Sequence, residues 1–150
     1  MFDELFGKEE KKQKSTSVNF DELIEKVKKM PFQEGQILLW KETFNLEKWH
    51  FITKPLVNLD NPKPFIGVVE GKGWMYLFTD GKHALKFGKV QGLLNNDGSI
   101  NTIAMKPKKA VELLDKFAKL GVFGVRFNQG EFGWYAPIEN LKPMMDYLKI

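Results

Sequence analysis

Asp80 and His83 are the residues of this sequence whose types and spacing come closest to a chemical site. They stand three positions apart, directly after the apolar stretch WMYLFT. The two side chains could line a small polar pocket that belongs to a small-ligand or enzymatic site. The same spacing predicts a helix N-cap, with Asp80 accepting from the first turn. A helix N-terminus also disfavours a charged imidazole, so capping is the preferred interpretation.

Arg126 is the second candidate, because it is the only arginine in a chain whose other cations are all lysines. A surface cation without a partner would serve equally well as lysine. The arginine therefore indicates a geometric need, such as a bidentate contact with a carboxylate. A structural salt bridge, with Glu70 as one candidate partner, is preferred over ligand binding.

Trp134 and Tyr135 form the third candidate, an aromatic pair near the end of a predicted hairpin. Aromatic side chains are frequent anchors of protein interfaces. Because 13% of the chain is aromatic, most such residues must lie in the core, and the pair could be core as well.

Other classes of site find little support. The chain has no cysteine, which excludes disulfides, thiolate zinc sites and cysteine nucleophiles. His50 lies between two aromatic residues and is predicted to be a core or half-buried residue. No third ligand with suitable spacing joins Asp80 and His83, so we expect no metal. No serine stands in a nucleophile elbow, and Gly71–Gly73 joins two predicted strands instead of preceding a helix, unlike a phosphate loop. We therefore expect no cofactor and no enzymatic activity.

The composition is that of a globular protein of 150 residues, with 43% hydrophobic residues and a net charge of +4. No apolar run reaches the ~18 residues of a membrane-spanning helix, and the N-terminus does not resemble a secretory signal. We expect a cytoplasmic protein without membrane contact. The lysines are scattered along the chain, which favours a solvated surface over a nucleic-acid site.

The first half of the chain is predicted to contain a tail, a helix and a hairpin. Residues 1–18 have the composition of a flexible tail, and residues 19–150 are predicted to form a single domain. Asn19 is a candidate N-cap for a helix that runs to about Met30. Gln36–Lys41 is predicted to be a strand, paired in a hairpin with Lys48–Thr53.

The middle of the chain predicts a hairpin that contains the centre of the sheet. Phe65–Glu70 and Trp74–Thr79 flank a three-residue turn, Gly71–Gly73. The second strand is apolar on both faces, which is typical of a central strand covered on both sides. A helix capped by Thr79 or Asp80 follows it.

The last third predicts a strand, a helix, a hairpin and a final helix. Phe123, Val125 and Phe127 are expected to share one strand face. In order, the elements are Ile100–Met105, a helix from Pro107 to about Leu120, Val122–Asn128, Phe132–Tyr135 and a helix over Ile138–Leu148. The predicted fold class is α+β: a mostly antiparallel sheet of about six or seven strands built from hairpins, with three or four helices.

Three stretches of this chain resemble the N-terminal domain of the SseB family (enhanced serine sensitivity protein B). They are WMYLFTDGKHAL, IAMKPKKAVELL and GVFGVRFNQGEFGWYAPIENL, and with QILLWK the likeness spans about residues 35–148. The resemblance implies a regulatory or accessory protein without catalytic residues. Related small domains are stand-alone partner-binding proteins, immunity-type proteins among them. Family members often carry a second domain that this sequence does not contain.

Three functions follow from these observations. The leading hypothesis is a non-enzymatic, SseB-like module that binds another protein, with a regulatory or immunity-type role. The first alternative is a small-ligand or enzymatic site near Asp80, His83 and Arg126, which requires the three to converge. The second alternative is weak, non-specific binding of nucleic acid through surface lysines. The candidate binding residues are Asp80, His83, Arg126, Trp134 and Tyr135.

Overall fold

The computed structural model describes residues 18–54 and 63–150. The chain consists of two compact units, and the boundary between them in the sequence lies between Glu42 and Thr43. The predicted tail, residues 1–18, lies outside the described residues except for Val18. The region predicted as one domain, 19–150, spans both units. Each unit is described by itself.

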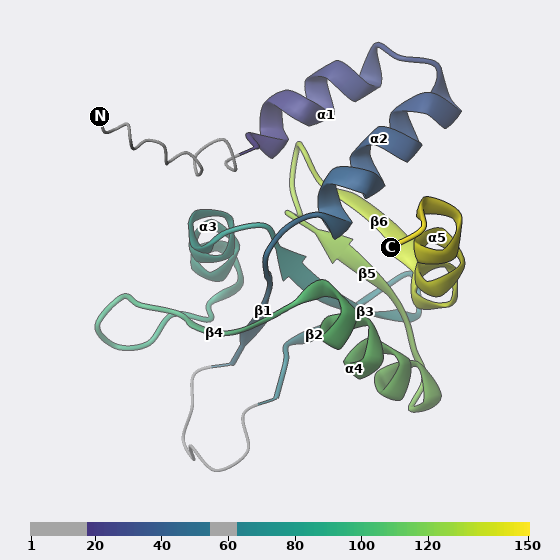
Figure 1. Cartoon of the computed structure of the whole chain (residues 1–150). Coiled ribbons are helices and arrows are strands. Elements are labelled where there is room, and N and C mark those ends of the chain that lie inside the picture. Colours follow the sequence, from purple (N-terminus) through teal and green to yellow (C-terminus); the bar gives the residue numbers. More distant parts are fainter. Residues whose placement is uncertain (1–17, 55–62) are drawn as a thin grey trace, which may run out of the picture. The chain divides into compact units, whose positions relative to one another are not determined.

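The first unit contains α1 (Phe20–Lys28) and most of α2 (Phe32–Phe44), as Figure 1 shows. Asn19 caps α1, as predicted, by accepting a hydrogen bond from the backbone of Glu22 at 3.1 Å. The two helices pack closely, because a Cβ at Gly35 would lie 2.9 Å from Val27 Cγ1.

The prediction of a strand at Gln36–Lys41 was wrong, because these residues lie inside α2. Their apolar side chains form an unbroken run, Ile37–Trp40, without the alternation that distinguishes a strand. A short apolar run fits a buried helix equally well. Consequently Lys48–Thr53 has no hairpin partner there.

The second unit is built on a six-stranded sheet with the order β4-β1-β3-β5-β6, and β2 pairs with β3 beside β1. Pairing is antiparallel except between β3 and β5, so the sheet is mostly antiparallel and the α+β class is confirmed. The strands are β1 (Trp49–Thr53), β2 (Ile66–Val69), β3 (Lys72–Phe78), β4 (Asn101–Met105), β5 (Val122–Phe127) and β6 (Trp134–Pro137).

The remaining helices are α3 (Gly81–Gln91), α4 (Pro107–Lys119) and α5 (Leu141–Leu148), with the short 3₁₀ helix η2 (Ile138–Asn140) before α5. The described residues thus contain five α-helices, one more than the upper expectation, because α2 replaces a predicted strand. Pro143 lies in the first turn of α5, where a missing N–H removes no helical bond.

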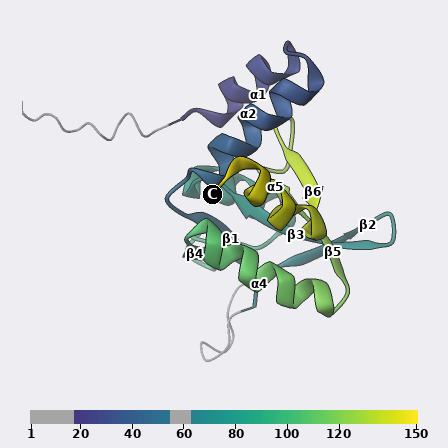
Figure 2. The same cartoon turned by 45° about the vertical axis from the view of Figure 1, so that its right-hand side comes forward.

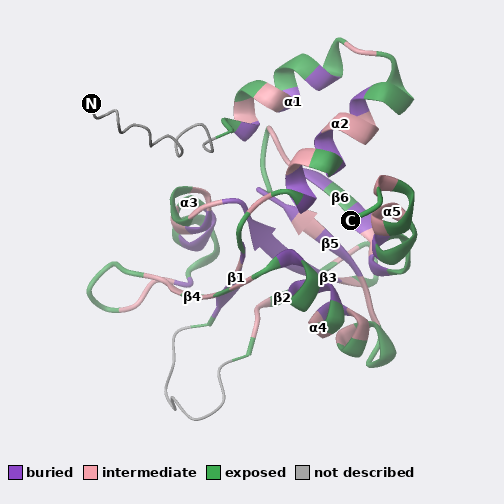
Figure 3. Cartoon of the chain, viewed as in Figure 1, coloured by how far each residue is buried: buried purple, intermediate pink, exposed green. Residues whose placement is uncertain are grey.

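β3 is the central strand of the sheet, as its two apolar faces predicted. Figure 3 shows it buried over most of its length, and every residue from Trp74 to Phe78 is buried. One face carries Trp74, Tyr76 and Phe78, which pack with Phe87 of α3. We call this the α3 face.

The opposite face is covered by α4 and η2, which both pack on β5. Its buried residues include Phe51, Leu77 and Phe127. Figure 2 shows α4 and α5 in front of the strands, and Lys142 of α5 reaches Asp115 of α4 at 2.6 Å. The sheet is therefore the middle layer between α3 and the α4–α5 pair.

The turn between β2 and β3 is tighter than the predicted Gly71–Gly73 loop. Val69 pairs with Lys72, so the loop has only two residues, Glu70 and Gly71. Both have positive φ, 53° and 79°. Two-residue hairpin loops with positive φ match the right-handed twist of the strands and are therefore favoured. Because the loop is this short, Gly73 belongs to β3 and not to the turn.

Phe123 does not share a face with Val125 and Phe127, contrary to the prediction. The register shifts between Gly73 and Trp74, so that Phe123 is the extra residue of a bulge on β5. A bulge redirects one side chain. Here it brings Phe123 onto Trp74, with ring centroids 5.2 Å apart.

Candidate functional site

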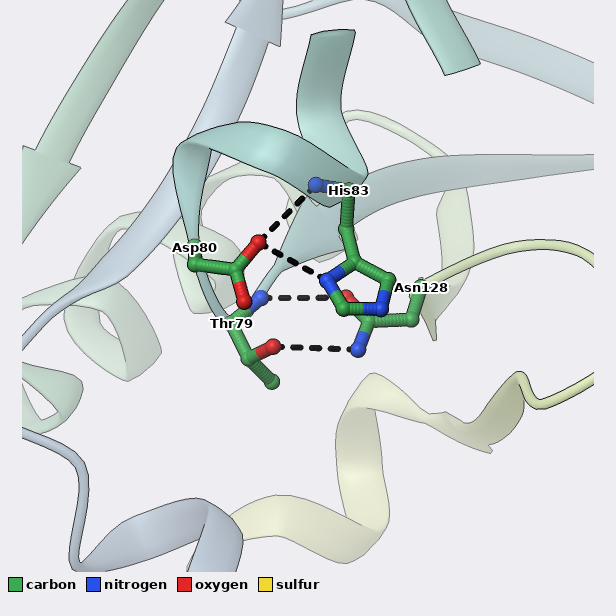
Figure 4. Close-up of polar contacts among 4 residues, drawn as sticks. All are labelled: Thr79, Asp80, His83 and Asn128. Atoms are coloured by element: carbon green, nitrogen blue, oxygen red, sulfur yellow. Dashed lines mark hydrogen bonds and ion pairs between the residues drawn. The ribbon is translucent and has the colours of Figure 1, made fainter. Parts of the chain in front are cut away.

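Four of the five candidate residues fall into two groups, one at the end of the parallel strands and one on the α3 face of the sheet. Thr79, Asp80, His83 and Asn128 lie where the parallel strands β3 and β5 end, and we call them the strand-end group (Figure 4). The second group lies on the α3 face, nearer the starts of β3 and β5, and consists of Trp74, Arg126 and Tyr135. We call it the arginine cluster.

Asp80 caps α3 and also holds the ring of His83. Its Oδ1 accepts from the backbone N–H of His83 at 2.8 Å and lies 2.8 Å from Nδ1 of the same residue. Burial by itself would raise the pKa of Asp80, but the backbone and side-chain hydrogen bonds from His83 outweigh it and lower the pKa below 3.8. The carboxylate is therefore ionised, so Nδ1 donates, and a neutral His83 keeps Nε2 as an acceptor. The predicted cap is confirmed.

Asn128 joins the ends of β3 and β5 through its side chain. Its Oδ1 accepts from Thr79 N at 3.0 Å and its Nδ2 donates to Thr79 Oγ1 at 3.0 Å (Figure 4). Its own N–H donates to Leu77 O at 2.9 Å, and its φ is 47°. Asparagine tolerates this left-handed conformation better than most residues, and its amide continues the pairing where the strands stop.

His50 is closer to this group than the sequence indicated. It lies on β1, where it pairs with Phe78 of β3, and it is partly buried, which confirms the half-buried position that the sequence allowed. Burial lowers its pKa from 6.5, the charge of Asp80 opposes that shift, and Lys48 adds to it. Even so, in the part of the chain described, no three His, Cys, Asp or Glu side chains are placed to hold a metal ion.

Lowering the pH from about 7 to about 5 is expected to destabilise the wild-type chain more than His50→Gln. Because the folded pKa of His50 lies below 6.5, the unfolded chain takes up a proton where the folded chain excludes it. The contribution of His50 is therefore complete above about pH 6.5 and declines as the pH falls through that window. Urea unfolding of both proteins across the window measures the difference. Equal pH slopes would contradict the prediction.

Arg126 stacks on aromatic rings instead of forming the predicted salt bridge. Its guanidinium carbon lies 4.2 Å from the ring centroid of Trp74 and 5.1 Å from that of Tyr135. Among the described residues no carboxylate pairs with it, and Glu70 lies in the β2–β3 turn. The geometric need for arginine at this position is therefore a flat cation that can stack on aromatic rings.

Trp134 and Tyr135 point to opposite faces of β6. Trp134 is buried and stacks on Phe127, with centroids 5.4 Å apart and planes at 4°, so it is not an exposed anchor. Tyr135 is 62% exposed, pairs with Arg126 and meets the ring of Trp74 edge-on at 5.7 Å. Of the predicted aromatic pair, only Tyr135 belongs to an accessible surface.

The two groups do not form one pocket. Arg126 pairs with Tyr76, and Asp80 lies four residues further along the chain, past the end of β3, which is roughly 13 Å at the usual rise of an extended chain. The guanidinium lies over Trp74, still further from Asp80. The structure thus does not bring Arg126 to Asp80 and His83, the convergence that an enzymatic site at these three residues required.

Sequence reasoning missed Trp74 and Asn128 as members of these groups. Trp74 was assigned only to the central strand, and no signal in the sequence pairs it with Arg126. Asn128 did carry a signal, because an asparagine at the end of an apolar strand suits positive φ.

No protein-family model matches this sequence, and no curated protein matches it either. The resemblance to the SseB family thus stays a prediction. Among the described residues, no helix is long and apolar enough to cross a membrane.

Proposed function

We propose that this chain is a cytoplasmic, non-enzymatic module of the SseB-like type that binds another protein through the arginine cluster. The observation that carries the proposal is the position of Tyr135. The residue is 62% exposed, yet its ring packs edge-on against the buried ring of Trp74 and beside Arg126. An accessory role, regulatory or immunity-type, is the role that fits such a module.

The composition of the arginine cluster supports binding. Tryptophan, tyrosine and arginine are the residues that most often dominate the energy of protein interfaces. Tyr135 offers a large contact area with only two rotatable bonds, so ordering it on binding costs little entropy. Trp74 is 5% exposed and holds the other two in place from within the sheet.

Tyr135→Ala tests the proposal, with Tyr147→Ala as the matched control. Both tyrosines are exposed, 62% and 67%, but Tyr147 lies on α5, away from the arginine cluster. The tagged chain and both variants are expressed in the native host, and retained proteins are identified by mass spectrometry. We expect one protein to bind wild type and Tyr147→Ala, and to bind Tyr135→Ala roughly tenfold or more weakly.

Two results would count against the proposal. One is that no protein is retained by the wild-type chain at micromolar concentration. The other is that Tyr135→Ala and Tyr147→Ala retain the partner equally well. Unfolding curves of both variants should match the wild type, because each substitution truncates an exposed side chain.

A further inference from the structure

Two hydrogen-bond donors of the arginine cluster are enclosed and have no acceptor. They are Nε1 of Trp74 and Nε of Arg126. Both groups can only donate, so the pair calls for an acceptor from outside the chain. Buried donors are almost always paired in folded proteins, which makes two in contact with one another informative.

A second cation extends the cluster along the α3 face. Lys72 Nζ lies 4.2 Å from the ring centroid of Phe123, and the Phe123 ring packs on Trp74 at 5.2 Å. A continuous row of cations and aromatic rings therefore runs from Lys72 through Phe123, Trp74 and Arg126 to Tyr135. In the described part of the chain no carboxylate pairs with Lys72 or Arg126. A negatively charged partner would complement this row.

We propose that the protein partner presents an aspartate or glutamate side chain to the arginine cluster. Its carboxylate accepts one hydrogen bond from Trp74 Nε1 and one from the guanidinium of Arg126. A planar group with two oxygens fits one donor from each of two side chains in contact. Phosphopeptides are often recognised by clusters of arginines, whereas this row has one arginine and a separate lysine. This inference rests on the proposed function.

Tyr135 lies beside both side chains that carry the donors. Its ring contacts Trp74 and the guanidinium of Arg126, and the residue is largely exposed. In the proposed complex this ring packs beside the bound carboxylate, so the partner would contact Tyr135 as well as Arg126.

The test is a titration of the ¹⁵N-labelled chain with N-acetyl-glutamic acid amide, whose only charge is the side-chain carboxylate. The indole N–H signal of Trp74, assigned through Trp74→Phe, reports binding. We expect it to shift progressively, at constant ionic strength, up to roughly 100 mM ligand. The indole N–H of Trp49 is the internal reference, because it already donates to Thr43 O at 2.8 Å and should not shift.

Arg126→Lys separates a guanidinium contact from simple charge attraction. The variant keeps the positive charge but loses the planar fork, so we expect affinity for the glutamic acid amide to fall roughly tenfold. The matched N-acetyl-glutamine amide should produce no shift. The inference is overturned if the glutamine amide shifts Trp74 equally, if N-acetyl-phosphoserine amide binds more tightly than the glutamic acid amide, or if no ligand produces a shift.

The titration and the capture experiment test different claims, and their outcomes can be told apart. A response to the glutamic acid amide without any captured protein would leave the carboxylate site standing and remove the protein partner. A partner captured through Tyr135, with no response of Trp74 to the amide, would remove only the carboxylate inference.

Discussion

Gly124→Ala is expected to destabilise the second unit by about 2–3 kcal/mol, the upper part of the range for overpacked cores. A Cβ at this position would lie 2.5 Å from Cζ3 of Trp74 and 2.7 Å from the carbonyl oxygen of Ala136. Neither neighbour can yield easily, because one belongs to a rigid buried ring and the other to the backbone of β6. The glycine therefore makes room for the ring on which Arg126 stacks.

Gly73→Ala is the matched control for this prediction. It lies in the same sheet on the neighbouring strand, and a Cβ there would meet its nearest atom, Ile66 Cγ2, at an ordinary 3.6 Å. We expect it to change stability by less than about 0.5 kcal/mol. Urea unfolding, followed by tryptophan fluorescence, compares the two variants. Similar midpoints for both alanine variants would contradict the packing argument at Gly124.

Asn128→Ala is expected to cost about 3 kcal/mol, the sum of lost hydrogen bonds, an orphaned donor and backbone strain. The substitution removes both side-chain hydrogen bonds to Thr79 and leaves the N–H of Thr79 without its acceptor. It also places alanine at a φ of 47°, which asparagine tolerates better. Because Thr79 precedes the cap of α3, we also expect the start of α3 to lose protection against hydrogen exchange.

Asn128→Gly separates the two causes. Glycine accepts positive φ without strain, so this variant loses only the side-chain hydrogen bonds. We expect it to be more stable than Asn128→Ala by about 1 kcal/mol, yet still less stable than wild type. If Asn128→Gly were as stable as the wild-type chain, the hydrogen bonds to Thr79 would contribute nothing and the explanation would be wrong.

Several elements of the fold could be predicted because their signals are local. Asn19 and Asp80 cap helices through side chains that reach only three residues along the chain. β3 was predicted to be central because both of its faces are apolar, a property of the strand itself. Capping and the apolar character of both strand faces involve neighbouring residues, so the amino-acid order contains them directly.

The errors occurred where local signals were ambiguous. The apolar run Ile37–Trp40 suits either a helix or a strand, and only the 13-residue length of α2 decides between them. The position of Phe123 depends on a register shift against β3, and that shift is a property of two strands that lie far apart in the sequence.

For the candidate site, the sequence by itself determined which residues were unusual, but not what they contact. It singled out Arg126 as the lone arginine, Tyr135 as an aromatic near a hairpin, and Asp80 with His83 as a capping pair. Only the tertiary structure decided that Arg126 stacks on Trp74 and Tyr135, that Trp134 is buried, and that Arg126 lies away from Asp80. The physical reason is that these outcomes depend on the parallel register of β3 and β5 and on the room that Gly124 leaves. Strand register arises from packing of the whole sheet, which no local pattern encodes.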